Sequence, residues 1–117
     1  MEFDRFTIAL LVTNPDGPQL SEPESHAIQD AHLDFLATLH DAGHLLAAGP
    51  VRDPGGELRG LSILRGDVET VRRLEAEDPA VRAGAFALRV FPWQVPAGAL
   101  HFTPTRFPHS IADAVRD

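Results

Sequence analysis

The middle of the chain reads HLLAAGPVRDPGGELRGLSIL over residues 44–64, and this stretch decides the fold. It predicts one strand over residues 44–48, broken by Gly49-Pro50, and a second strand over residues 58–64. The segment Asp53-Pro54-Gly55-Gly56 between them is typical of a loop. We therefore expect the two strands to pair as a hairpin.

A strand and a helix are predicted before this hairpin. Residues 6–13 are apolar and contain enough β-branched side chains for a central strand. Ser21 has the position of a helix N-cap, and Glu24 completes a capping box, so the helix should run over residues 22–42. Its expected apolar stripe consists of Ile28, Ala31, Phe35, Leu39 and Ala42, opposite Asp30, Asp34 and Asp41.

A second helix and a fourth strand are predicted after the hairpin. Asp67 is the expected N-cap of this helix, which should end near Asp78 because the residue before Pro79 is biased away from helical geometry. Residues 85–91 then alternate as a strand that Pro92 closes. The helix is expected to turn Val68, Val71 and Leu74 inward and to leave Glu69, Arg72, Arg73 and Glu75 largely in solvent.

This βαββαβ order predicts an α+β domain of the ferredoxin-like class, with two helices on one face of an antiparallel sheet. The other face of the sheet then needs a cover. A second copy of the same sheet would supply it, so we expect a homodimer. We assign residues 1–96 to this domain and residues 97–117 to a C-terminal extension that packs on the domain or on the dimer. Prolines interrupt the tail until residues 110–115, which suit a short helix.

The composition argues against several classes of function. The formal net charge is −7 without a cluster of Lys or Arg, which argues against a nucleic-acid partner. Because the chain has no cysteine, a thiolate nucleophile, a disulfide and a cysteine zinc site are excluded. The first residues are acidic where a signal peptide would be basic, and the apolar run at residues 8–12 is far too short to span a bilayer. We expect a cytoplasmic protein without a membrane partner.

His32 is the leading candidate for chemistry. It lies on the apolar side of the first helix, between Ile28, Leu36 and Leu39, and a histidine changes its charge near neutral pH. The end of the second helix should bring Asp78 close to it. An Asp that accepts from one ring nitrogen fixes the tautomer, which leaves the other nitrogen as a general acid–base. Two plainer interpretations remain open: His32 as a packed core residue, and Asp78 as the N-cap of the following turn.

The other histidines give weaker signals. His40 and His44 have the spacing of a helical metal pair, but Gly43 should end the helix between them, so we expect no metal site. The remaining ones are not expected to form a site: His26 lies near the helix start, and His101 and His109 lie in the tail without a spaced carboxylate partner.

No serine nucleophile or phosphate-binding loop is predicted. Ser62 lies inside a predicted strand without an elbow motif around it. The pair Gly55-Gly56 lacks the lysine and the helix start of a phosphate loop. Arg52, Arg59 and Arg89 could steer an anionic ligand, although surface solvation is the default interpretation of each.

Four short motifs follow one another along the chain. They are AHLDFL at residues 31–36, LLAAGP at residues 45–50, GLSIL at residues 60–64 and EDPAVRAG at residues 77–84. Each motif is weak alone, but their joint occurrence in this order is fairly specific. Together they resemble the YciI-like (YCII-related) family. The resemblance covers roughly residues 6–95, and residues 97–117 lie outside it.

This resemblance implies a dimeric ferredoxin-like α+β barrel with a His–Asp active site, which the motifs carry onto His32 and Asp78. It also implies that Gly49 and Pro50 shape the cleft, and we expect the ligand to contact them. Two further expected ligand contacts, Phe35 and Ala80, lie in the motifs. The family commonly has an aromatic residue where this chain has Ala80, and often a tyrosine where it has Phe86, so the pocket should be roomier and less polar.

The resemblance implies the chemistry only in outline. One member class is a dehydrochlorinase acting on a chlorinated hydroxyquinol, and related dimeric barrels include lactone isomerases and cofactor-free monooxygenases. These enzymes move protons on small ring-like or lactone-like substrates in a mostly apolar cavity. Our leading hypothesis is a cofactor-independent enzyme of lyase or isomerase type, in which His32 shuttles a proton and Asp78 orients it. A non-catalytic dimeric module that binds small molecules or a partner, and a purely structural His–Asp hydrogen bond, remain open alternatives.

Overall fold

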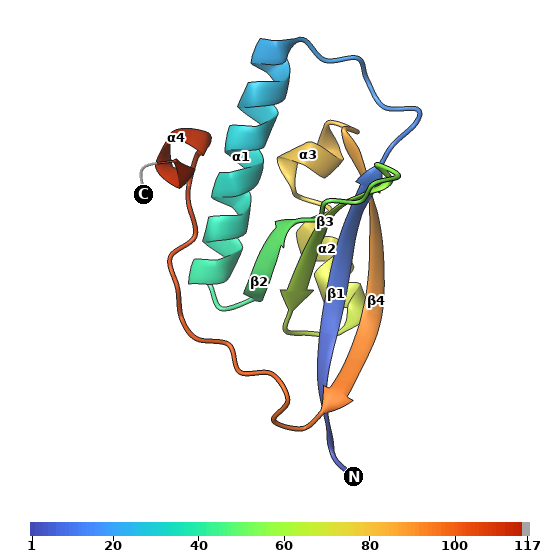
Figure 1. Ribbon diagram of the computed structural model, residues 1–117, viewed down its shortest axis with the longest axis vertical. Helices are drawn as coiled ribbons and strands as arrows, with labels where there is room; N and C mark the ends of the chain where they lie inside the picture. Colours follow the sequence, from blue (N-terminus) through green and yellow to red (C-terminus); the bar gives the residue numbers. More distant parts are fainter. Residues whose placement is uncertain (116–117) are drawn as a thin grey trace.

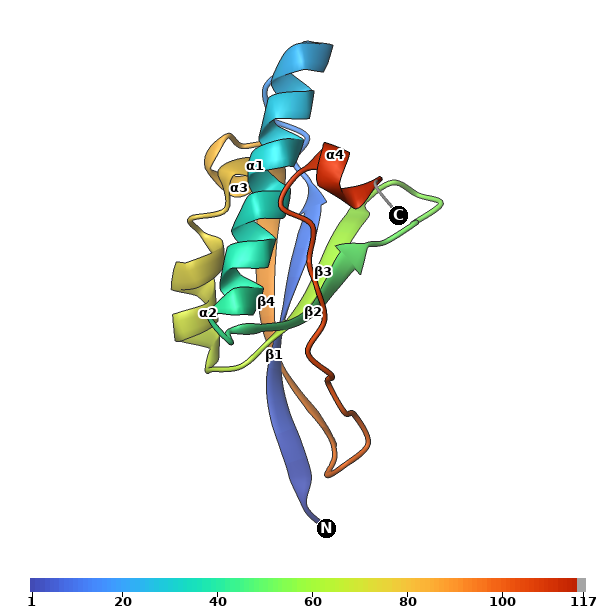
Figure 2. The same cartoon turned by 90° about the vertical axis from the view of Figure 1, so that its left-hand side faces the viewer.

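Four antiparallel strands form one sheet with helices against one of its faces (Figures 1 and 2). The computed structural model describes residues 1–115. The strand order is β2-β3-β1-β4, and the helix α1 follows β1 while α2 and α3 follow β3. The predicted α+β ferredoxin-like class is thereby confirmed. The elements are β1 Phe3–Thr13, α1 Glu22–Asp41, β2 Leu45–Pro50, β3 Leu58–Leu64, α2 Val68–Glu75, α3 Pro79–Arg82, β4 Phe86–Pro96 and α4 Ile111–Ala114.

The predicted hairpin and both predicted helix starts are confirmed. β2 and β3 pair antiparallel, with Gly49 opposite Leu61. α1 begins after a complete capping box, in which the Glu24 N–H donates to the Ser21 hydroxyl and the Ser21 N–H donates to the Glu24 carboxylate. The Asp67 carboxylate accepts from the N–H of Thr70 at the start of α2. Local capping chemistry therefore sets where the helices begin.

Two strands run through prolines that were expected to end them. β2 continues through Pro50, which lies opposite Gly60, and β4 continues through Pro92, which lies opposite Thr7. Both predicted ends were wrong because β2 and β4 are the edge strands of the sheet. A proline is tolerated on an edge, where the N–H that it lacks would have pointed to solvent. Residues 93–96 consequently belong to the sheet and not to the irregular tail.

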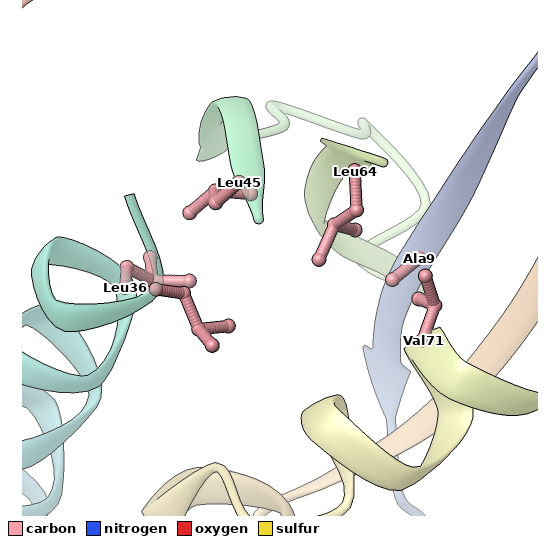
Figure 3. Close-up of a cluster of buried hydrophobic side chains, with 6 residues drawn as sticks. Ala9, Leu36, Leu45, Leu64 and Val71 are labelled. Carbon is pink, nitrogen blue, oxygen red and sulfur yellow. The ribbon is translucent and has the colours of Figure 1, made fainter. Parts of the chain in front are cut away.

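The core lies between the sheet and the helices and is shown in Figure 3. Leu36 and Leu39 of α1 meet side chains from β1, β2, β3 and α2 there. The stripe predicted for α1 was partly wrong, since Ala31 and Ala42 are exposed. The buried stripe is turned toward Leu36, Ala37 and Leu39, and His32 lies one helical turn before Leu36. The full core cluster consists of Ala9, Leu36, Leu39, Leu45, Leu64 and Val71.

The face of the sheet away from the helices is also apolar. Ile8 of β1 lies opposite Ile63 of β3 and Phe91 of β4, and Leu10 lies opposite Leu61. These side chains alternate with Ala9 and its neighbours, which face the helices, so they point to the other side. All five are partly buried within the single chain. No helix in residues 1–115 is long and apolar enough to cross a membrane.

The tail after β4 returns along the molecule to α1. Figure 2 shows it passing β2, and both figures show it ending in α4 beside α1. Phe102 packs edge-on against Phe6, with ring centroids 5.4 Å apart, and Phe107 stacks on His40 at 4.0 Å. The helix predicted over residues 110–115 is present as α4, Ile111–Ala114. The last two residues of the predicted extension, 116 and 117, lie outside the described residues.

Candidate active site

α1 and α3 together position His32 and Asp78. Asp78 is the N-cap of α3, and α3 packs against α1. The Nδ1–H of His32 donates to Oδ2 of Asp78 over 2.8 Å. The side chain of Asp78 is fully buried, and that of His32 is 12% exposed. The structure thus brings the two predicted residues into direct contact, at a place where water barely reaches the pair.

Asp78 serves two partners with its two oxygens. While Oδ2 accepts from His32, Oδ1 accepts from the backbone N–H of Ala80 over 2.9 Å. The cap and the histidine partner, which the sequence left as alternatives, therefore exist together. Because both oxygens are engaged, the carboxylate is fixed in orientation, and it holds the imidazole ring in one orientation in turn.

A cavity of about 640 Å³ opens beside His32. It lies between α1, the helix-facing side of the sheet and the C-terminal tail. Among the described residues, no hydrogen-bond partner is found for the Nε2 atom of His32, which leaves this nitrogen available to a ligand. The polar side chains of the lining are few: Gln29, His32, Arg59 and Ser62. Such a cavity has the size and the mostly apolar character of a small-molecule site.

The expected ligand contacts fall into two groups. Gly49 and Pro50 line the cavity. Phe35 packs instead against the hydrophobic core. Ala80, the second residue of α3, is only 1% exposed. Neither residue lines the cavity described within residues 1–115. Phe86 is part of the lining. Of the two residues behind the expected roomier, less polar pocket, Phe86 therefore borders the cavity and Ala80 does not.

Glu75 was expected in solvent, and this was wrong. Its side chain is 1% exposed, and its Oε1 atom finds no hydrogen-bond partner in residues 1–115. Burial raises the pKa of Glu75 from 4.5 to about 7, and the negative charge of Asp78 adds to the rise, whereas His32 lowers it. The sequence carried a usable signal: Glu75 lies four residues after the buried Val71, which places both on one face of α2.

His109 also differs from its prediction. It was expected to lack a carboxylate partner, but its Nδ1–H donates to Oδ1 of Asp34 over 2.6 Å, and Nε2 lies 3.7 Å from Asp41. The hydrogen bond with Asp34 raises the pKa of His109 above 6.5, and the charges of Asp34, Asp41 and Asp113 add to this. The partner was missed because it lies on α1, far away in the sequence.

The histidines considered as a metal pair do not share a site. Both ring nitrogens of His40 face backbone carbonyl oxygens, that of Leu45 at 2.8 Å and that of Thr105 at 2.9 Å. His44 follows the end of α1 and is exposed. Within residues 1–115 no group of three or more His, Asp or Glu side chains is arranged to hold a metal ion.

The family model described as the YCII-related domain matches residues 8–94. The chain belongs to the YCII-related family. The matched range contains His32, Asp78, Gly49 and Pro50, but it ends before the tail that completes the cavity. No curated protein matches the chain.

Solved structures are similar to this YCII-related protein. One is the 5-chloro-2-hydroxyhydroquinone dehydrochlorinase from Burkholderia phenoliruptrix AC1100, in complex with 2,5-dihydroxybenzoquinone. It is 20% identical, covers 75% of this chain and 92% of its own, and gives a TM-score of 0.52. Another is a dimeric protein of unknown function with a ferredoxin-like fold from Bacteroides fragilis NCTC 9343, with 11% identity, a TM-score of 0.48, and coverage of 78% and 96% respectively. At 20% identity the likeness to the dehydrochlorinase shows the fold alone.

Proposed function

We propose that this YCII-related protein is a small cofactor-independent enzyme that moves a proton on a ring-shaped or lactone-like organic molecule. One observation carries the proposal. A histidine whose Nδ1 is held by a buried aspartate lines an apolar cavity of small-molecule size, and its Nε2 has no hydrogen-bond partner in residues 1–115. In this proposal His32 is the general acid–base, and Asp78 is the residue that orients it.

The chemistry follows from the orientation of the ring. With Nδ1–H donating to Asp78, the lone pair of Nε2 accepts a proton from a C–H or O–H of the bound molecule. The electron pair left on a carbon moves into an adjacent carbonyl, giving an enolate. His32 then returns the proton to another carbon, which is an isomerisation. Alternatively the electron pair expels a leaving group, which takes up the proton from His32 as it departs, and this is an elimination. The positive charge that forms on the imidazole lies next to the Asp78 carboxylate throughout.

The ligand of a structural neighbour supports the choice of a ring. The dehydrochlorinase with the same fold was solved with 2,5-dihydroxybenzoquinone. We infer for the present chain only the general class, a small cyclic molecule with an acidic C–H or O–H. The cavity lining, with many apolar and few polar side chains, suits such a molecule.

We also propose that the functional unit is a homodimer. The face of the sheet opposite the helices carries Ile8, Leu10, Leu61, Ile63 and Phe91, and within the chain these are covered only in part. A second copy of this face would bury them. Size-exclusion chromatography with light scattering tests this, and a monomer at all concentrations would contradict it.

The catalytic proposal is tested with α-angelica lactone, whose conversion to β-angelica lactone is a shift of one proton along the ring. We expect the protein to catalyse this shift and His32→Asn to lower the rate about a hundredfold or more, the usual contribution of a general acid–base. The matched control is His26→Asn, an exposed histidine on the same helix, which should keep full activity. Circular dichroism checks that both variants are folded. A His32→Asn protein with wild-type activity would contradict the proposal.

The second candidate is a non-catalytic module that binds a small molecule. The double role of Asp78 favours it. Because Asp78 caps α3, its presence is explained by structure and needs no catalytic role. This candidate predicts that 2,5-dihydroxybenzoquinone binds in a His32-dependent manner, and that neither this compound nor the lactone is converted.

A further inference from the structure

The cavity beside His32 is completed by a part of the chain that the family model does not reach. The matched range ends at residue 94, whereas residues 107–115 supply one side of the cavity. We call these residues the C-terminal segment. Its contributions are all apolar: Phe107, Pro108, Ile111, Ala114 and Val115.

The C-terminal segment is held on α1 by specific contacts. The backbone N–H of Ile111 donates to Asp30 over 2.8 Å, and His109 donates to Asp34 over 2.6 Å. The ring of Phe107 stacks on His40 at 4.0 Å. These contacts reach α1 along much of its length, so the segment has a defined position over the cavity.

The part of the cavity lining that lies on the sheet has a different chemistry. Arg59 reaches it from β3, with its guanidinium 5.5 Å from the centre of the Phe86 ring. Among residues 1–115, no carboxylate forms an ion pair with Arg59, and no other lining residue is a lysine or an arginine. An unpaired guanidinium at the border of an apolar cavity favours an anionic group of a ligand, because the acidic chain offers it no partner there.

We propose that the C-terminal segment determines ligand specificity, and that the site takes a planar one- or two-ring molecule with an anionic edge toward Arg59 and an apolar edge toward Ile111. This inference rests on the proposed function only in placing the ligand in the cavity beside His32. The two sides of the cavity differ in polarity, so a ligand with the same asymmetry buries its apolar edge and keeps its charge paired. A molecule that is polar on both edges would leave one polar edge against the C-terminal segment.

Two quinones with different edges test the proposal by isothermal titration calorimetry. 2-Hydroxy-1,4-naphthoquinone has one anionic edge and one apolar edge, whereas 2,5-dihydroxybenzoquinone is polar on both. We expect the naphthoquinone to bind about tenfold more tightly, because its second ring buries apolar surface against the C-terminal segment. Ile111→Asn should bring the two affinities close together. Ala112→Asn, an exposed neighbour on α4 outside the cavity lining, should keep the preference.

A second variant guards against simple detachment of α4. Ala114→Leu places a larger side chain in the cavity from the same helix and so reduces its volume. This variant should exclude the two-ring probe and still bind the one-ring probe. Arg59→Gln should weaken both probes by a similar factor. Equal affinities of the wild-type protein for the two probes, no saturable binding of either, or an intact preference in Ile111→Asn would each overturn the inference. If His32→Asn keeps both the lactone activity and the preference for the naphthoquinone, the proposed catalysis fails and the specificity inference stands.

Discussion

Two histidine–aspartate pairs use the same helix, and they differ in burial and in the cap that Asp78 also forms. His32 of α1 meets Asp78 at 2.8 Å, and Asp34 of α1 meets His109 at 2.6 Å. The first pair is 12% and 0% exposed, whereas the second is 51% and 61% exposed. Distance alone would rank them as equals. Because water screens the second pair, the two should respond very differently to the loss of one partner.

The largest difference is expected when each aspartate is removed. Asp78→Ala takes away a cap and leaves His32 without its buried partner, so the free energy of unfolding should fall by about 4 kcal/mol. Asp34→Ala should leave it nearly unchanged, because its pair is exposed and screened by water. Urea unfolding of the two variants at neutral pH measures both values. Similar losses would show that burial does not separate the two pairs.

Glu75 is a buried carboxyl group that interacts electrostatically with Asp78 and His32 of the buried pair. The pKa of Glu75 is raised from 4.5 to about 7, so the folded state resists its ionisation. The contribution of protonated Glu75 to the free energy of unfolding is therefore complete below pH 4.5. It is lost as the pH rises through about 7, and the loss is about 3 kcal/mol in total. Glu75→Gln should remove this loss and make the variant more stable than the wild type at neutral and higher pH.

Urea unfolding at about pH 5 and about pH 8 separates Glu75 from other titrating groups. The matched control is Glu77→Gln, an exposed glutamate that pairs with Arg82 beyond the end of α2. Its dependence on pH should follow that of the wild type. A Glu75→Gln protein that loses stability between the two pH values as strongly as the wild type would contradict the assignment.

The two pairs also show what the sequence can and cannot predict. His32 and Asp78 were found because a polar ring on an apolar stripe and an Asp-Pro start of a turn are local patterns, and the βαββαβ order places them close together. The partner of His109 was missed because the tail folds back onto α1 through contacts that no local pattern contains. The tail side of the cavity was missed for the same reason.

Other errors have different physical causes. Pro50 and Pro92 were read as strand ends because the sequence does not reveal which strands lie at the edge of the sheet. Glu75 was placed in solvent by residue type, although its spacing from Val71 indicated the buried face of α2. The prediction for Glu75 followed its charged residue type and ignored its helical spacing. The spacing alone would have placed this carboxyl group, which interacts with Asp78, on the buried face of α2.

The smallest expected effect belongs to the exposed pair, and it is local. The pKa of His109 is raised, chiefly by the hydrogen bond with Asp34, so its stabilising contribution is complete below pH 6.5 and is lost as the pH rises through the raised pKa. The charged groups around it are Asp34 and Asp41 of α1 and Asp113 of α4, which also pairs with Arg106. Loss of the positive charge should therefore loosen the C-terminal segment without unfolding the domain.

Hydrogen exchange of the Ile111 amide, which donates to Asp30, reports this loosening directly. We expect His109→Gln to lower the protection factor of this amide several-fold at acidic pH, while amides of the core strand β1 keep theirs. In the wild type the protection should fall as the pH passes the raised pKa of His109, and added salt should lower it further. His101→Gln, an exposed histidine of the same tail, serves as the control and should change nothing. If Ile111 stays equally protected in His109→Gln, the contacts of Asp30 and Phe107 hold the C-terminal segment without the exposed pair.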